Sequence, residues 1–180
     1  MIRKIEAFFD IFFKAKGKHV FSLFLGLCIP VLPIQAFMAF FLALRVLGRD
    51  IENKSSIVSY LSLPFKKREI FFLSWISGVF LIFVASLIGW TLTGTINILN
   101  FTYLVIFFSF YYGVSLFFVA RGYSLFGMAI FIFIIDAVLL SVPGYAYISV
   151  ITQGNSLYSA LFSLLGLGVG YYGFIYHYEG

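Results

Sequence analysis

Charged residues are scarce in this chain of 180 residues: only 11% are Asp, Glu, Lys or Arg, against about 25% in an ordinary soluble domain. Seven acidic and twelve basic side chains cannot cover the surface of a globule in which 62% of the residues are hydrophobic. Disordered chains are polar and poor in apolar residues, so the same composition excludes disorder. The sequence therefore excludes a water-soluble domain.

Cysteine is almost absent. The single cysteine, Cys28, excludes a disulfide framework and a cysteine-based metal site. His19 and His177 have no carboxylate or cysteine to support them as ligands, so no metal site is expected. No Ser-His-Asp set or pair of carboxylates comes together at one membrane depth, and we expect no catalytic residues.

In place of charged residues and cysteines, the chain contains long apolar runs. No charged residue occurs between Ile70 and Ala120, a run of 51 residues. One helical crossing of a membrane needs about 20 residues, so this run holds two spans and a turn. The strands of a transmembrane β-barrel would alternate polar and apolar residues, whereas these runs are apolar on every face. The composition predicts a helical membrane protein.

Residues 1–18 predict an amphipathic helix that lies in the membrane interface. Its apolar residues, from Ile2 to Phe13, recur at helical spacing on one face, and charged residues occupy the other. Asp10 and Lys14 form a favourable pair four positions apart. We expect the basic side of this helix to face the lipid headgroups.

Residues 17–48 predict a short helical hairpin, with spans near 17–30 and 33–48. Pro30 and Pro33 would break the helix and form the outer turn. Both flanks of the hairpin are basic, and the positive-inside rule places both in the cytoplasm. That placement requires an even number of crossings.

The rest of the chain predicts four further spans. Spans three and four lie within 70–120 and are divided by an outer turn at 93–100, and spans five and six lie within 125–176. The outer segment 143–156 is too apolar for a solvated loop and is expected to re-enter the membrane or lie in its interface. All twelve Lys and Arg then fall on the cytoplasmic side.

The expected fold is thus an all-α integral membrane protein, a single transmembrane domain over 1–180. Six transmembrane helices follow an interfacial helix, and both termini are cytoplasmic. The net charge of +5 marks the cytoplasmic side of a multi-pass protein of the plasma membrane. We therefore expect membrane lipid, and no nucleic acid, among the partners.

The predicted cytoplasmic loop 49–69 is the only polar stretch long enough to offer a partner a surface. A short apolar helix at 57–63 is followed by a basic cluster, Lys66, Lys67 and Arg68. On charge alone, the favoured interpretation is a solvated loop that only fixes the topology.

The string SLPFKKREI, which starts at Ser62, favours a second interpretation. It resembles the coupling segment of type-2 ATP-binding-cassette (ABC) transporter permeases, which has the form L-S-L-P-x-x-[RK]-R-E-I between spans two and three. The matching residues are Leu61, Ser62, Leu63, Pro64, Lys67, Arg68, Glu69 and Ile70. The resemblance extends to the N-terminal amphipathic helix, the six spans and the apolar outer segment.

The resemblance implies that 57–69 contains a coupling helix that docks on a separate ATPase subunit. The implied coupling residues are Ser62, Leu63, Pro64, Phe65, Lys66, Lys67, Arg68 and Glu69. Two permease units, identical or different, would assemble with two ATPases. This chain has no GxxxxGK[ST] loop, so it is expected to bind no cofactor, and ATP and Mg²⁺ would bind to the partner ATPase. The expected function is the permease subunit of an exporter of a lipid, peptide or drug.

Asp136 is the sole ionisable residue within the core of a predicted span. A carboxylate at this depth costs roughly 2.5–3.5 kcal/mol, so it must be protonated, hydrogen-bonded to a Ser or Tyr, or in contact with water. It is either a group on the substrate path or a neutral acid bonded between helices. The first interpretation leaves open a proton-coupled secondary carrier, and a scaffold subunit without transport activity is a further alternative.

Span six carries five small residues at intervals of four and three positions, which places them on one helix face. They are Ser159, Ser163, Gly166, Gly170 and Gly173. Small residues in this pattern let a second helix approach closely. We expect packing within the chain rather than a dimer interface.

Overall fold

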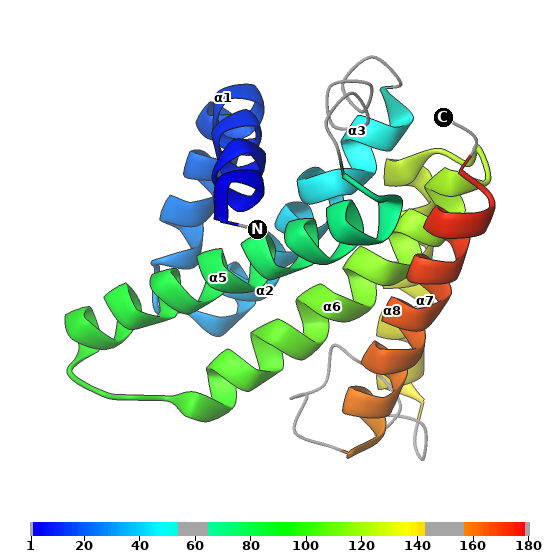
Figure 1. The fold of residues 1–180 in the computed structure, drawn as a ribbon. Coiled ribbons are helices and arrows are strands. Elements are labelled where there is room, and N and C mark those ends of the chain that lie inside the picture. Colours follow the sequence, from blue (N-terminus) through cyan, green and yellow to red (C-terminus); the bar gives the residue numbers. More distant parts are fainter. Residues whose placement is uncertain (1, 54–64, 143–156, 179–180) are drawn as a thin grey trace.

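The computed structural model describes residues 2–53, 65–142 and 157–178, and the regular secondary structure in these ranges is helical (Figure 1). Four helices are long and apolar enough to cross a membrane: Leu32–Glu52, Lys67–Thr93, Ile98–Ala120 and Leu157–Tyr176. The chain is therefore an all-helical protein with several potential membrane spans. The count of six spans and the side on which the termini lie stay predictions.

The N-terminal helix α1 (Ile2–Leu27) differs from the prediction, because it continues for 26 residues through the expected boundary between the interfacial helix and the first span. Gly17 lies at that boundary, but one glycine inside a helix costs only about 1 kcal/mol and does not end it. Phe8 and Phe12 on the apolar face are fully buried. These two rings therefore pack on the rest of the protein.

The chain reverses after α1 where the two prolines predict it. Pro33 lies in the first turn of α2 (Leu32–Ala43), where its missing N–H leaves no hydrogen bond unmade. The side chain of Gln35 spans the hairpin and donates from Nε2 to the carbonyl oxygen of Leu27 at 2.9 Å. The helices α1 and α2 pack against each other.

The second helix of the hairpin extends beyond its predicted end at residue 48. It passes through a π-helical turn, η1 (Leu44–Gly48), into α3 (Arg49–Glu52). The first residues of the predicted loop 49–69 are therefore helical, and its last three begin the next helix. The predicted short helix at 57–63 lies outside the described residues.

The four later helices closely match the predicted spans: α5 (Lys67–Thr93), α6 (Ile98–Ala120), α7 (Leu125–Ser141) and α8 (Leu157–Tyr176). Gly94 ends α5 in the left-handed conformation, which glycine adopts without strain. Asn97 and Ser124 cap the next two helices through their side chains. With 17 residues, α7 is about 25 Å long and shorter than a typical bilayer core. The outer segment 143–156 lies outside the described residues.

Helix α6 is central to the fold, since it packs on α2, α5, α7 and α8, and Figure 1 shows it running between α5 and α8. Two hydrogen bonds fix α5 on it: Tyr112 Oη donates to Phe71 O at 2.8 Å, and Trp75 Nε1 donates to Ser109 Oγ at 2.9 Å. The core of the protein is therefore built around the buried aromatic face of α6.

Candidate functional site

Residues 65–69, named here the junction, are the described part of the predicted coupling segment, and they start α5. The backbone N–H of Lys66 donates to Glu69 Oε2 at 2.8 Å, within a capping box. This bond satisfies an N–H at the end of the helix and fixes the direction in which the chain enters α5. Glu69 therefore has a local role in the cap of α5.

The junction also contacts both ends of the chain. Phe65 is buried, and its ring meets that of Phe8 on α1 edge to face, with centroids 6.1 Å apart. Lys67 Nζ donates to the carbonyl oxygen of Tyr178 at 2.5 Å and lies 5.7 Å from its ring. Partial burial raises the pKa of the Tyr178 phenol, which keeps it neutral near this lysine. The start of α5 is thus joined to α1 and to the segment after α8.

The basic residues of the junction divide into two kinds. Lys66 and Arg68 are exposed, whereas Lys67 is half-buried by its contacts with Tyr178. The exposed pair can contact another protein without breaking a contact inside this one. The contacts with Phe8 and Tyr178 were not predictable from the motif, because both residues are far away in the sequence. Ser62, Leu63 and Pro64 lie outside the described residues.

Asp136 lies on α7 and is buried, with 6% of its surface exposed. It accepts a hydrogen bond from Tyr111 Oη on α6 at 3.1 Å. Phe40 and Phe133 pack their rings near that of Tyr111, with centroids 5.1 and 6.2 Å away. The carboxyl group therefore joins two helices inside an aromatic environment, and a hydrogen bond to a Ser or Tyr was one of the three arrangements expected for it.

The five small residues of α8 are all buried, and α8 packs most extensively on α6. A Cβ atom added to Gly170 would lie 2.2 Å from the carbonyl oxygen of Gly113, and one added to Gly113 would lie 2.2 Å from that of Gly166. The backbones of the two helices are therefore in direct contact within the chain. Gly113, which the sequence reasoning missed, follows a run of aromatic residues and is the residue of α6 that permits this contact.

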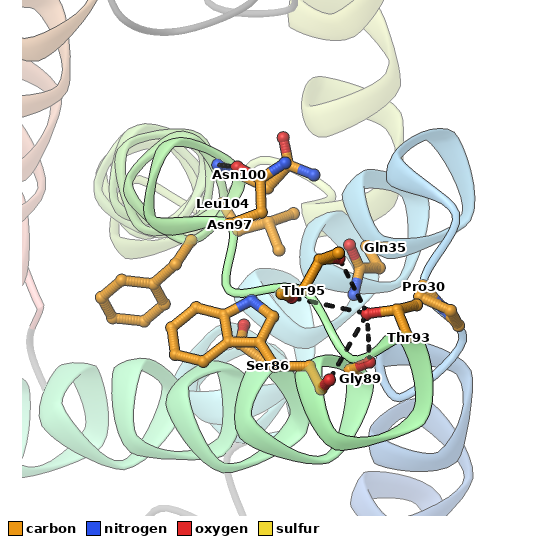
Figure 2. A pocket seen from close by; sticks show the side chains of 11 residues that line it. Pro30, Gln35, Ser86, Gly89, Thr93, Thr95, Asn97, Asn100 and Leu104 are labelled. Carbon is orange, nitrogen blue, oxygen red and sulfur yellow. Dashed lines mark hydrogen bonds between the residues drawn. The ribbon is translucent and has the colours of Figure 1, made fainter.

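A polar cavity of about 140 Å³ lies at the end of α5 that is remote from the junction (Figure 2). Gln35 from α2, Ser86 from α5 and Asn100 from α6 line it together with turn residues. The Thr93 hydroxyl, also at its wall, donates to the carbonyl oxygen of Gly89 at 3.0 Å. No pattern in the sequence predicts this cavity, because its walls come from three helices that no spacing pattern connects. Its amide and hydroxyl groups can bind water or a small polar group.

Among the residues that the structure describes, no three His, Cys, Asp or Glu side chains come close enough to hold a metal ion. His19 is on α1 and His177 follows α8. The geometry of these residues gives no reason to add a metal site.

Comparison with protein-family models, curated proteins and solved structures finds no match to this chain. The resemblance of residues 61–70 to ABC permeases therefore stays a prediction. The motif and the contacts of the junction together are the basis for a functional proposal.

Proposed function

We propose that this chain is the membrane-spanning permease subunit of an ATP-driven ABC transporter that exports an apolar or amphipathic substrate. The observation that carries the proposal is the set of contacts at the junction. A coupling segment has to pass the movement of an ATPase to several helices at once. The junction starts α5, touches α1 through Phe65 and touches the segment after α8 through Lys67.

Helix α5 is suited to carry that movement across the membrane. It is one uninterrupted helix of 27 residues, so a displacement at the junction reaches its other end about 40 Å away. There, Ser86, Gly89 and Thr93 line the polar cavity. A movement of the ATPase would therefore change the shape of a cavity on the far side of the protein.

The remaining parts of the transporter would come from partners. ATP and Mg²⁺ would bind to the ATPase subunit, and a second permease unit would complete the substrate path. Asp136 is a candidate contact on that path. An apolar or amphipathic substrate, such as a lipid, peptide or drug, fits a chain in which 62% of the residues are hydrophobic.

The proposal is tested by purifying the tagged full chain from its native membrane in a mild detergent and measuring the ATPase that is recovered with it. We expect an ATPase subunit to co-purify. The double substitution Lys66→Gln/Arg68→Gln should reduce its recovery at least tenfold, because the loss of even one charged hydrogen bond, about 1.5–3 kcal/mol, weakens binding by that factor. These residues are exposed, so the variant should retain its fold.

A matched control removes two exposed positive charges elsewhere, at Lys18 and Arg121. Lys18→Gln/Arg121→Gln should leave the recovery of the ATPase unchanged. The proposal is wrong if the unmodified chain recovers no ATPase, or if both double variants recover as much as the unmodified chain.

A proton-coupled carrier is the second candidate, and the observation that favours it is the burial of Asp136 beside the Tyr111 phenol. Intramembrane carboxylates often carry protons. Transport by such a carrier would stop when the proton gradient collapses, continue after ATP depletion and be lost in Asp136→Asn. Transport by the ABC permease would stop after ATP depletion, so measuring transport under the two treatments separates the candidates.

A further inference from the structure

We infer that the surface formed by α1, η1, α3 and α5 binds an anionic phospholipid, with its phosphate in a basic pocket and an acyl chain in an adjoining apolar groove. The inference does not depend on the proposed transport function. Two cavities that share one residue, Val20, lie on this surface.

The basic pocket has a volume of about 200 Å³ and lies between α1 and the η1–α3 segment. Lys16, one of its basic residues, is buried and forms an ion pair with Asp50, while also donating to the carbonyl oxygens of Arg45 and Val46. These two charges offset each other. The π-helical turn at this point is of a kind often found at functional sites.

The two arginines of the pocket give it its net positive charge. Arg45, Arg49 and His19 line it, and the ion pairs of the described residues include neither arginine. The nearby carboxylate of Glu52 makes a different contact: its Oε1 accepts a hydrogen bond from the backbone N–H of Leu125 at 3.1 Å. Two guanidinium groups in one pocket repel each other, and a phosphate between them would relieve that repulsion and accept paired hydrogen bonds from both.

The apolar groove has a volume of about 530 Å³ and is formed by α1 and α5. Its walls are mainly aromatic and aliphatic, with Phe21 and Phe24 from one helix and Phe80 and Val84 from the other. Such a surface can hold a hydrocarbon chain but has few groups to bind a soluble ion. Lys18 at its edge can extend toward the headgroup region along its apolar stem.

The combination of the two cavities identifies the ligand. Free phosphate would occupy the basic pocket, but it has no apolar part that could fill the groove. A zwitterionic phosphatidylcholine would bring a positive choline group to a pocket that is already positive. An anionic phospholipid matches both, and basic pockets between helices on the cytoplasmic side of membrane proteins bind such headgroups.

The test measures lipid binding to the purified full chain in detergent by native mass spectrometry. The probes are dioleoyl phosphatidylglycerol and dioleoyl phosphatidylcholine, with glycerol phosphate measured separately by calorimetry. We expect the chain to bind the anionic lipid about tenfold more tightly than the zwitterionic one. Arg45→Gln/Arg49→Gln should remove that preference, whereas Lys66→Gln/Arg68→Gln, which removes two charges outside the pocket, should keep it.

A second pair of variants tests the groove alone. A Cβ on Gly17 would meet no atom within 4 Å, and Gly17 lines the groove, so Gly17→Leu should place a side chain in the path of the acyl chain. Gly168→Leu is the matched control, because this glycine on α8 also has open space around it. Gly17→Leu should weaken binding of the lipid several-fold and leave glycerol phosphate unaffected. If the arginine variant fails to fold, Gly17→Leu still tests whether the lipid binds in the groove.

Three results would overturn the inference. The first is equal binding of the two lipids, and the second is unchanged binding in both the arginine variant and Gly17→Leu. The third is binding of glycerol phosphate as tight as that of the lipid, with no effect of Gly17→Leu. That last result would assign the pocket to a soluble phosphate compound.

Discussion

At the scale of single residues, Asp136 and Tyr111 show how this chain keeps a carboxyl group inside a membrane protein. The oxygen of Asp136 accepts from the Tyr111 phenol, so a polar group that would otherwise destabilise α7 connects it to α6. The same bond can hold a structure together or position an acid on a substrate path. Loss of the phenol hydroxyl would lower stability in the first role and would impair transport in the second.

We expect Tyr111→Phe to lower the free energy of unfolding by about 1 kcal/mol, because hydrogen bonds between membrane helices contribute roughly 0.6–1.7 kcal/mol. The substitution keeps the aromatic ring and its packing. Unfolding of the chain by dodecyl sulfate in mixed micelles, followed by circular dichroism, measures the change. Tyr176→Phe is the control, since this tyrosine is 69% exposed and its removal should change little. Equal stability of both variants would mean that the bond contributes nothing to the fold.

The buried residues also show how much of the structure can be predicted from single residues. Asp136 was recognisable because it is the sole ionisable residue in its predicted span, but its partner is one of twelve tyrosines and no pattern distinguishes it. The sequence predicted Lys16 only as one of the basic residues that flank the hairpin, and it predicted nothing for Asp50. These two residues form a buried ion pair, which depends on the packing of two helices and so could not be inferred from position in the sequence.

At the scale of helices, the contact between α6 and α8 is the most extensive in the described structure, and glycine makes it possible. The spacing of small residues in α8 predicted that another helix would approach it. The identity of that helix depended on Gly113, a single glycine that carries no periodic signal. A pattern of small residues therefore predicts a contact face but not its partner.

Gly170→Ala should destabilise the protein by about 1–3 kcal/mol, the usual cost of overpacking, because its new methyl group would lie 2.2 Å from a backbone oxygen that cannot turn away. Gly168→Ala, two positions earlier on the same helix, should be neutral or slightly stabilising, because it meets open space. Thermal unfolding in detergent, followed by helical content, measures both. Loss of stability in Gly168→Ala alone would contradict the packing described here.

The helix boundaries show where sequence patterns succeed and fail. The bounds of α7 and α8 agree with the prediction, because Ser124 and the apolar run from Leu157 mark them clearly. At Gly17 the composition changes, but the backbone continues as a helix through the predicted boundary. The π-helical turn at Leu44–Gly48 was also missed, since its carbonyl groups are bound by a lysine from another helix.

At the scale of the whole molecule, the direction of each helix determines which loops lie on the same side of the protein. The 94–97 turn and the 121–124 turn lie at opposite ends of α6, which is about 34 Å long. The second of these ends lies near α3 and the end of α8 (Figure 1). If α6 crosses the membrane, the two turns must be on opposite sides of it.

Labelling of introduced cysteines tests this arrangement in a Cys28→Ser background. Thr95→Cys should react with a membrane-impermeant maleimide from outside the cell, and Tyr123→Cys should react only after the membrane is opened. Both positions are exposed in the structure, so lack of reaction reports the membrane and not burial. A tag at the C-terminus should be accessible together with Tyr123→Cys. Labelling of both cysteines from outside would contradict the predicted topology.

The backbone contact between α6 and α8 has a consequence for how the protein can move. Side chains that interlock can change rotamer and let two helices slide by small steps, but main-chain atoms in contact at Gly113 and Gly170 have no such freedom. The two helices therefore form one rigid unit, which can tilt or rotate only as a whole. The contacts of α5 and α7 with these two helices include side-chain hydrogen bonds, which can rearrange more easily than main-chain atoms in contact.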